Sequence, residues 1–169
     1  RVGGIVNPNI EAIAALKPDL ILLSMEGNQQ EDFGTLARLG VPVFVTNPRD
    51  LKGIAKSLRD IGALTGRPDE GAAAAVTLLR RTDSLTAFAK TFPAVRTLLV
   101  VSLQPLMVVG EGTFLQELLS AAGGDNLAAG SPSTYPTFSR EAVVTGDPDV
   151  LLCMADVLRD PAELTVVYP

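Results

Sequence analysis

The chain has 169 residues, of which 47% are hydrophobic, enough for one domain or two small lobes with buried sheets. Its formal net charge of −5, without any run of basic residues, argues against a nucleic-acid partner. Because the chain contains no histidine, a Ser-His-Asp triad and any histidine-based zinc site are excluded, and no metal ligand is assigned.

The first third of the chain alternates helical patterns with short apolar runs. We predict helices over 7–17, 31–39 and 51–64, and strands over 20–23 and 41–45. The run Leu20 to Leu23 is apolar throughout, as expected for a strand covered on both faces of a parallel sheet. The alternation indicates a β-α-β series that winds a parallel sheet.

A single long helix is predicted over 68–92. Pro68 suits a first helical position, and Asp69 and Glu70 place negative charge at the amino end, where the helix dipole favours it. Pro93 ends the pattern. We expect this helix to connect two α/β halves.

The remaining sequence repeats the alternation. Strands are predicted over 97–101, 107–109 and 150–153, helices over 113–122 and 139–144, loops over 102–106 and 125–137, and a short helix with an unfinished strand over 155–169. The lone Cys153 lies in the apolar strand pattern and is expected to be an inert, packed thiol. The predicted fold class is α/β, with two lobes containing parallel sheets (1–67 and 93–169) joined by one long rigid helix (68–92).

The two halves share a spaced pattern. Glu11 begins a capped helix that is followed by Pro18-Asp19 and an apolar strand, and Glu141 begins an equivalent helix followed by Pro148-Asp149 and an apolar strand. In both copies the proline stands seven positions after the glutamate. Each glutamate alone suits a helix amino end. The pair also predicts two symmetric charges at a rim, suited to docking on a twofold partner.

These and other segments carry a resemblance to a known family. They are Asn9-Ile10-Glu11, Leu16-Lys17-Pro18-Asp19, Gly27-Asn28, Leu39 to Val43, Val109-Gly110, Ala122 to Asn126, Tyr135-Pro136 and Ser139-Arg140-Glu141. Together they resemble the helical-backbone, metal-chelate class of substrate-binding proteins of ABC importers, with the greatest likeness to its cobalamin-binding branch. The family chain begins before the position of Arg1 and continues past Pro169, so the sequence is expected to be truncated at both ends.

The resemblance implies a non-enzymatic carrier without a resident cofactor. Its ligand would be cobalamin or another metal chelate, held between the lobes and delivered to a permease dimer. Glu11 and Glu141 match the family glutamates that form salt bridges with permease arginines. The expected location is the periplasm or the outer face of the membrane, with membrane association only through the permease or an anchor outside this chain.

Candidate ligand-binding residues lie in the loops at the strand ends, where open α/β sheets hold their ligands. They are Ile5, Ser24, Asn28, Arg49, Gln104 and Tyr135. Ile5, Ser24 and Tyr135 align with family positions that pack on the corrin. Tyr135 either stacks on a flat ligand or packs on its own lobe. Arg49 either pairs with a ligand carboxylate or phosphate or is a solvated loop charge.

Three other functions stay open from the sequence. A ferric siderophore or haem carrier fits Arg49 and Tyr135 nearly as well as a corrinoid carrier does. A hydrolase using paired carboxylates is a remote alternative. A module that only docks on the permease is the third. Separately, a sheet that lacks its terminal strands would expose edges, from which we expect some self-association.

Overall fold

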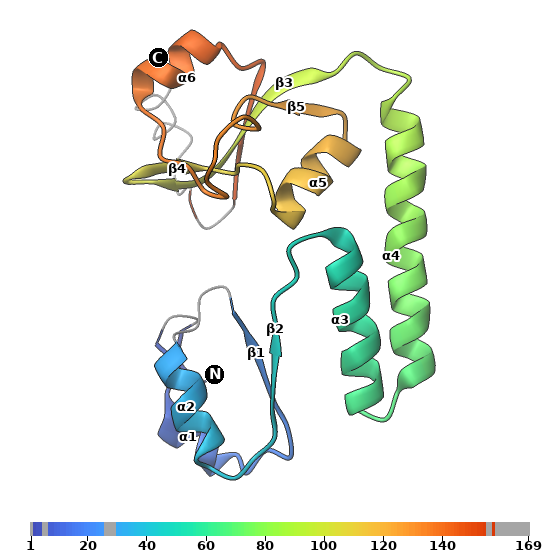
Figure 1. Ribbon diagram of the computed structural model, residues 1–169, viewed down its shortest axis with the longest axis vertical. Helices are drawn as coiled ribbons and strands as arrows, with labels where there is room; N and C mark the ends of the chain where they lie inside the picture. Colours follow the sequence, from blue (N-terminus) through green and yellow to red (C-terminus); the bar gives the residue numbers. More distant parts are fainter. Residues whose placement is uncertain (1, 5–6, 26–29, 155–156, 158–169) are drawn as a thin grey trace. The chain divides into compact units, whose positions relative to one another are not determined.

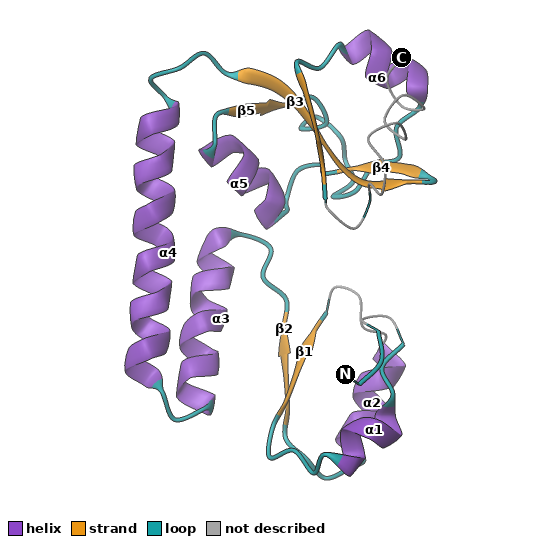
Figure 2. Cartoon of the chain, turned by 180° about the vertical axis from the view of Figure 1, so that it is seen from behind, coloured by secondary structure: helices purple, strands orange, loops and turns teal. Residues whose placement is uncertain are grey.

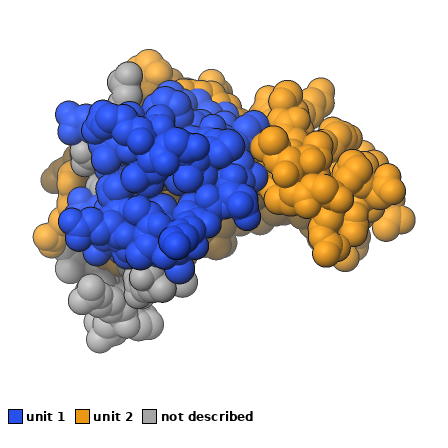
Figure 3. Space-filling view, turned by 90° about the horizontal axis from the view of Figure 1, so that it is seen from below, with its two compact units in different colours: residues 1–48 blue, residues 49–169 orange. Residues whose placement is uncertain are grey.

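The computed structural model describes residues 2–4, 7–25, 30–154 and 157 (Figures 1 and 2). Contacts divide the chain into two compact units, Arg1–Pro48 and Arg49–Pro169 (Figure 3). The long helix and the helix before it both belong to unit 2. The predicted lobes and bridging helix stay a prediction, because this division groups elements by contact and does not locate a ligand cleft.

Unit 1 is a small α/β unit. Its elements are α1 (Ile10–Ala15), β1 (Ile21–Ser24), α2 (Gln30–Ala37) and β2 (Val43–Thr46). The two strands pair in parallel, with Ile21 opposite Val43 and Ser24 opposite Thr46. Ile21 and Leu36 are buried at 8% and 0% exposure, so the interior of this unit lies between the strands and α2.

Two helices form a tight hairpin at the start of unit 2. The first, α3 (Leu51–Leu64), has the predicted bounds, and the second is α4 (Pro68–Ala89). Gly66, with φ of 72°, turns the chain between them. A Cβ on Gly62 would lie 2.8 Å from the Cα of Gly71, so only glycine permits this approach of the two helices.

The long helix begins at Pro68 as predicted, but it ends at Ala89 and not at Phe92. Beyond Lys90 the amides of Thr91 and Phe92 bond to the carbonyls of Phe88 and Ala89, three residues earlier. The chain therefore tightens into a turn before Pro93, a frequent ending of helices that no local pattern in the sequence specified.

The sheet of unit 2 is built on β3 (Val95–Leu103). This strand pairs antiparallel with β4 (Leu106–Val108) and parallel with β5 (Gly124–Asn126) and β6 (Val150–Cys153). Helices α5 (Phe114–Ala121) and α6 (Arg140–Gly146) complete the unit. The predicted α/β class is confirmed, although the antiparallel β4 makes this sheet mixed.

Two details of this sheet differ from the prediction. The loop predicted over 102–106 shrinks to the tip Gln104-Pro105, because β3 continues to Leu103 and pairs with Leu106. β5 lies in the stretch read as a helix stop and loop. Its sequence Gly-Asp-Asn has no apolar alternation, and it becomes a strand because the backbone of β3 offers partners for its hydrogen bonds.

The main core lies on β3. Leu98, Val100 and Val108 are fully buried, and Ala128 and Val143 join them at 2% and 1% exposure. Phe138 and Cys153 pack against this cluster, as predicted for the Cys153 thiol. Burial raises the pKa of the Cys153 thiol, in keeping with an unreactive side chain. The segment predicted over 155–169 lies outside the described residues except for Val157.

Candidate functional site

The first predicted docking glutamate, Glu11, lies in the first turn of α1. Asn9 caps this helix, because its Oδ1 accepts a hydrogen bond of 2.9 Å from the amide of Ala12. Glu11 is the second helical residue and is exposed to solvent. A helix dipole favours an acidic residue in the first turn.

The second, Glu141, has the same setting in α6. Ser139 is the cap, and its hydroxyl accepts a hydrogen bond of 3.1 Å from the amide of Ala142. Glu141 is again the second helical residue and is exposed. Its pKa is lowered, first by a hydrogen bond from its own backbone amide, then by one from Ser139 and by the charge of Arg140. This carboxylate therefore stays ionised to a lower pH than an ordinary glutamate.

The likeness of the two copies extends past the helices. Among the described residues, Lys17 and Asp147 are the non-glycine residues with positive φ, at 47° and 44°. Each stands six positions after its glutamate and directly before the proline. A left-handed residue is uncommon outside glycine, so its recurrence at the same position shows one backbone unit used twice. The structure thus presents the two glutamates at equivalent points of two equivalent segments.

The described candidate ligand residue of unit 1, Ser24, lies at the carboxyl end of a strand. Ser24 is the last residue of β1, is exposed, and stands opposite Thr46 at the end of β2. The hydroxyl of Thr46 bonds to the carbonyl of Leu23 at 3.2 Å, which joins the two strand ends. Ile5 and Asn28 lie outside the described residues.

Tyr135 lies in a segment that runs alongside β4. The amide of Val108 bonds to the carbonyl of Pro136 at 3.1 Å, and the amide of Gly110 bonds to the carbonyl of Thr134 at 2.8 Å. The backbone on both sides of Tyr135 is therefore fixed, and its side chain is half-buried. A Cβ on Gly110 would collide with the carbonyl oxygen of Ser133, so glycine permits this pairing.

Gln104 lies away from Tyr135 on the same ladder. It is exposed at the tip between β3 and β4, whereas the pairing of Met107 with Thr137 sets Tyr135 opposite Val109. Because Leu103 pairs with Leu106, Gln104 is level with Pro105, four positions from the level of Val109, or roughly 14 Å along an antiparallel strand. The tip lies at the end of the ladder from which α6 begins, so Gln104 is closer in register to the start of α6 than to Tyr135.

Arg49 is the first residue of unit 2 and precedes α3. It is exposed, and the next residue, Asp50, caps the helix, since its Oδ1 accepts a hydrogen bond of 2.6 Å from the amide of Gly53. Arg49, Gln104 and Tyr135 thus belong to one compact unit, while Ser24 belongs to the other.

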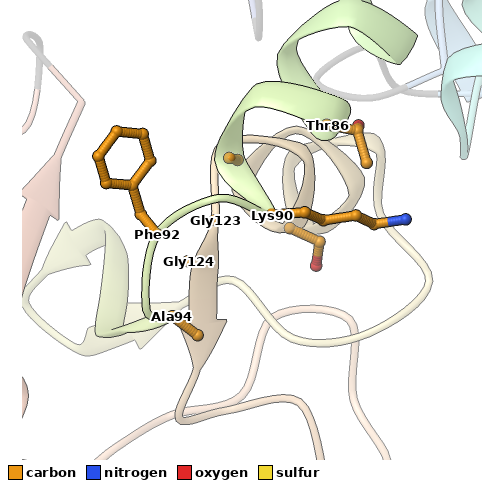
Figure 4. Close-up of a pocket in the computed structure, with 8 residues that line it drawn as sticks. Thr86, Lys90, Phe92, Ala94, Gly123 and Gly124 are labelled. Carbon is orange, nitrogen blue, oxygen red and sulfur yellow. The ribbon is translucent and has the colours of Figure 1, made fainter.

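A separate pocket of about 180 Å³ lies at the end of α4. It is lined by Thr86, Ala89, Lys90, Phe92, Ala94, Ser120, Gly123 and Gly124. Figure 4 shows the Phe92 ring and the Lys90 side chain pointing in opposite directions, so they do not converge on one ligand. The volume is below the roughly 300 to 1,000 Å³ of small-molecule sites, and none of the candidate ligand residues lines the pocket.

One residue near the candidate site was not found from the sequence. Glu117, on α5, accepts a hydrogen bond of 2.7 Å at its Oε2 from the amide of Leu51. The two residues are 66 positions apart, and a glutamate on a helix is common, so no pattern in the sequence signals this contact.

Residues 1–163 match the periplasmic binding protein family. The chain belongs to this family. It is 36% identical over 145 residues to the vitamin B12-binding proteins of Yersinia pestis (strain Pestoides F) and Yersinia pseudotuberculosis (serotype O:1b). The matched residues cover 85% of this chain and 51% of each relative. The predicted class of binding protein is therefore confirmed.

Solved structures with the same fold include two binding proteins with different named ligands. The periplasmic vitamin B12-binding protein of Vibrio cholerae matches 92% of this chain and 61% of its own at a TM-score of 0.76. A periplasmic haem-binding protein of Pseudomonas aeruginosa matches 98% and 61% at a TM-score of 0.83. Both are 28% identical to this chain, so identity to these two does not separate corrinoid from haem.

The periplasmic binding protein spans about half the length of the curated relatives that it matches. Among its described helices, none is both long enough and apolar enough to cross a membrane.

Proposed function

We propose that this periplasmic binding protein captures cobalamin or a related corrinoid on its strand-end loops and delivers it to the permease dimer of an ABC importer outside the cytoplasm. The observation that carries the proposal is the repeated segment around Glu11 and Glu141. Two exposed carboxylates in the same local geometry match the paired charges that a twofold permease would receive. Identity of 36% to vitamin B12-binding proteins supports the corrinoid.

A haem or ferric siderophore carrier is the second candidate. The haem-binding protein of Pseudomonas aeruginosa favours it, since this structure covers 98% of the chain. Haem carries two carboxylates, and the exposed guanidinium of Arg49 suits a bidentate pair with one of them. The carboxylate-pair hydrolase receives no support from the matched relatives, which are named as binding proteins.

Calorimetric titration of the chain with cyanocobalamin, hemin and a ferric hydroxamate tests these alternatives. Saturable binding of cyanocobalamin at micromolar or tighter Kd, with weaker binding of the other two, supports the corrinoid. Preference for hemin or the hydroxamate assigns the second candidate. Absence of binding to all three contradicts the chain's role as a ligand carrier.

Two substitutions then locate the ligand. Replacing Tyr135 by Ala is expected to weaken corrinoid binding roughly tenfold, because stacked rings contribute about 0.5 to 1.5 kcal/mol beyond their buried area. Tyr135→Phe retains the ring and serves as the control. Arg49→Ala is expected to weaken hemin binding more than cyanocobalamin binding, and Arg81→Ala, an equal loss of charge at an exposed site on α4, is its control.

The docking role has a separate readout. Glu11→Arg and Glu141→Arg are expected to leave ligand Kd unchanged and to abolish binding to the purified permease dimer of the cognate importer, since each reverses a charge at the contact. Glu31→Arg, at an exposed position in the first turn of α2, is the matched control. If the two variants bind the permease as well as the control does, the docking assignment is wrong.

A further inference from the structure

The hydrogen bond from the Leu51 amide to Glu117 satisfies a first-turn amide of α3 with a carboxylate from another helix, α5. Leu51 is the first helical residue, so its amide has no carbonyl partner within α3. Asp50 satisfies the amide of Gly53 at 2.6 Å, and Glu117 satisfies that of Leu51 at 2.7 Å. Two carboxylates thus lie at the positive end of a 14-residue helix, where the dipole stabilises both.

This contact holds α3 at the end opposite its crossing with α4. At the far end the helix is fixed by the approach of Gly62 to Gly71 and by the bond of 2.7 Å from the amide of Arg67 to the carbonyl of Gly62. Helix α5, which supplies Glu117, also packs on α4. Figures 1 and 2 show α3 and α5 both lying beside α4 within unit 2, with α5 beyond the end of α3 at which Leu51 lies.

Arg49 stands two positions before Leu51, whose amide is bonded to Glu117. Leu51 is 6% exposed, so its backbone is enclosed, while the side chain of Arg49 is exposed. The carboxylates of Glu117 and Asp50 hold the amides of Leu51 and Gly53, which lie two and four positions after Arg49. Glu117 is itself exposed, so its removal takes little packing from the core.

We propose that Glu117 is a positioning residue for the ligand site: by bonding the Leu51 amide it fixes the start of α3 on α5 and so sets the place of the Arg49 guanidinium. The inference rests on the proposed function as a ligand carrier, and it adds that Arg49 contacts an anionic group of the ligand, a carboxylate or a phosphate. A preplaced guanidinium binds more tightly because less freedom is lost on binding.

Hydrogen exchange of the Leu51 amide tests the contact without ligand. Glu117→Ala is expected to raise its exchange rate about tenfold, the factor for one charge-assisted hydrogen bond. Glu117→Gln keeps an acceptor oxygen and is expected to restore most of the protection. Glu111→Ala removes the same charge from an exposed residue before α5 and is expected to change nothing. Unchanged exchange in Glu117→Ala overturns the proposal.

Titration with hemin and cyanocobalamin tests the link to Arg49. Glu117→Ala is expected to weaken whichever of the two binds by about three- to tenfold, with partial recovery in Glu117→Gln. When Arg49→Ala is also present, removing Glu117 is expected to cost nothing more, because the two residues act as one unit. Additive losses, or an unaltered Kd in Glu117→Ala, overturn the positioning role and leave the carrier function intact. Failure of the unaltered chain to bind either probe defeats the proposed function and this inference with it.

Discussion

The α1–β1 segment of unit 1 and the α6–β6 segment of unit 2 have the same backbone conformation around their glutamates but differ in their surroundings. Helix α1 contains no buried residue, whereas Val143 of α6 is 1% exposed and belongs to the main core. β6 pairs with the nine-residue β3, near whose start the amide of Asp149 donates to the carbonyl of Arg96 and the amide of Arg96 donates to the carboxylate of Asp149. Local sequence therefore specifies the repeated segment, and its tertiary partners decide how firmly each copy is held in the fold.

The largest expected difference comes from equivalent apolar positions, Ile13 and Val143, each two residues after its glutamate. Val143→Ala is expected to lower the free energy of unfolding by about 2 to 3 kcal/mol, because it leaves a cavity in a closed core. Ile13→Ala removes more atoms but is expected to cost only about 1 kcal/mol, since Ile13 is half-buried. Urea denaturation measures both.

The neighbouring Val144, 45% exposed, provides the control for that pair. Val144→Ala is expected to change the free energy of unfolding by less than about 0.5 kcal/mol. Equal losses in Ile13→Ala and Val143→Ala would show that the two segments are equally buried in solution and would remove the contrast.

Replacing the capping residues Asn9 and Ser139 is expected to have the second largest effect on stability. Asn9→Ala and Ser139→Ala are each expected to destabilise their helix by about 1 kcal/mol, because a helix amide loses its side-chain acceptor. Ser139→Ala is also expected to raise the pKa of Glu141, since one of its hydrogen bonds is lost. NMR titration of the carboxyl carbons measures that pKa, and Ser139→Thr, which keeps a hydroxyl, is the control.

The lowered pKa of Glu141 fixes the sign of its pH dependence. In the unaltered chain its ionised form is favoured by folding, so its contribution to stability is complete above the unfolded pKa and is lost as pH falls through the lower folded value. Stability below the ordinary pKa range of a glutamate should therefore fall less steeply in Ser139→Ala. A Glu141 pKa that is unchanged in this variant would contradict the assigned cause.

Arg96 is expected to have a smaller effect. Its guanidinium donates to the carbonyl of Gly146 and lies 3.7 Å from Asp147, so it secures the end of α6. Arg96→Ala is expected to cost about 0.5 to 1 kcal/mol, because its side chain is 43% exposed and the ion pair is screened. Hydrogen exchange in α6 should quicken while that in α1 stays the same. Acceleration in both helices would mean that Arg96 acts on the whole fold.

Replacing the left-handed residues Lys17 and Asp147 by glycine is expected to have the smallest effects on stability. The expected effects of the two substitutions also differ most in direction. Lys17→Gly is expected to stabilise the chain by a few tenths to about 1 kcal/mol, because glycine adopts positive φ without a steric cost. Asp147→Gly is expected to gain less or to lose stability, since aspartate tolerates this conformation and Asp147 faces Arg96 at 3.7 Å. Thermal unfolding of both variants under the same conditions measures the two changes in stability. An equal gain in stability at both positions would show that the ion pair of Asp147 with Arg96 does not contribute.

Much of the fold was predictable because its signals are local. The bounds of α3 and β6 and the first residue of α4 follow the sequence, since an Asp cap, Pro68 and an apolar run each act within a few residues. The repeat around Glu11 and Glu141 was found in the same way, by spacing alone. Ser24 ends β1 and Tyr135 lies in a segment paired alongside β4, and their roles as ligand contacts stay predictions.

Other features were decided only by tertiary structure. β5 has no apolar pattern and is a strand because the backbone of β3 pairs with it, and the separation of Gln104 from Tyr135 follows from a register that the sequence does not encode locally. The approach of Gly62 to Gly71 and the bond from Leu51 to Glu117 join residues whose types are common on any helix. The sequence alone determined the elements with local signals and the repeated segment around Glu11 and Glu141, through short-range caps and periodicity. The folded chain decided which distant backbone groups satisfy one another, because a buried amide or carbonyl takes whichever partner the packed structure brings within reach.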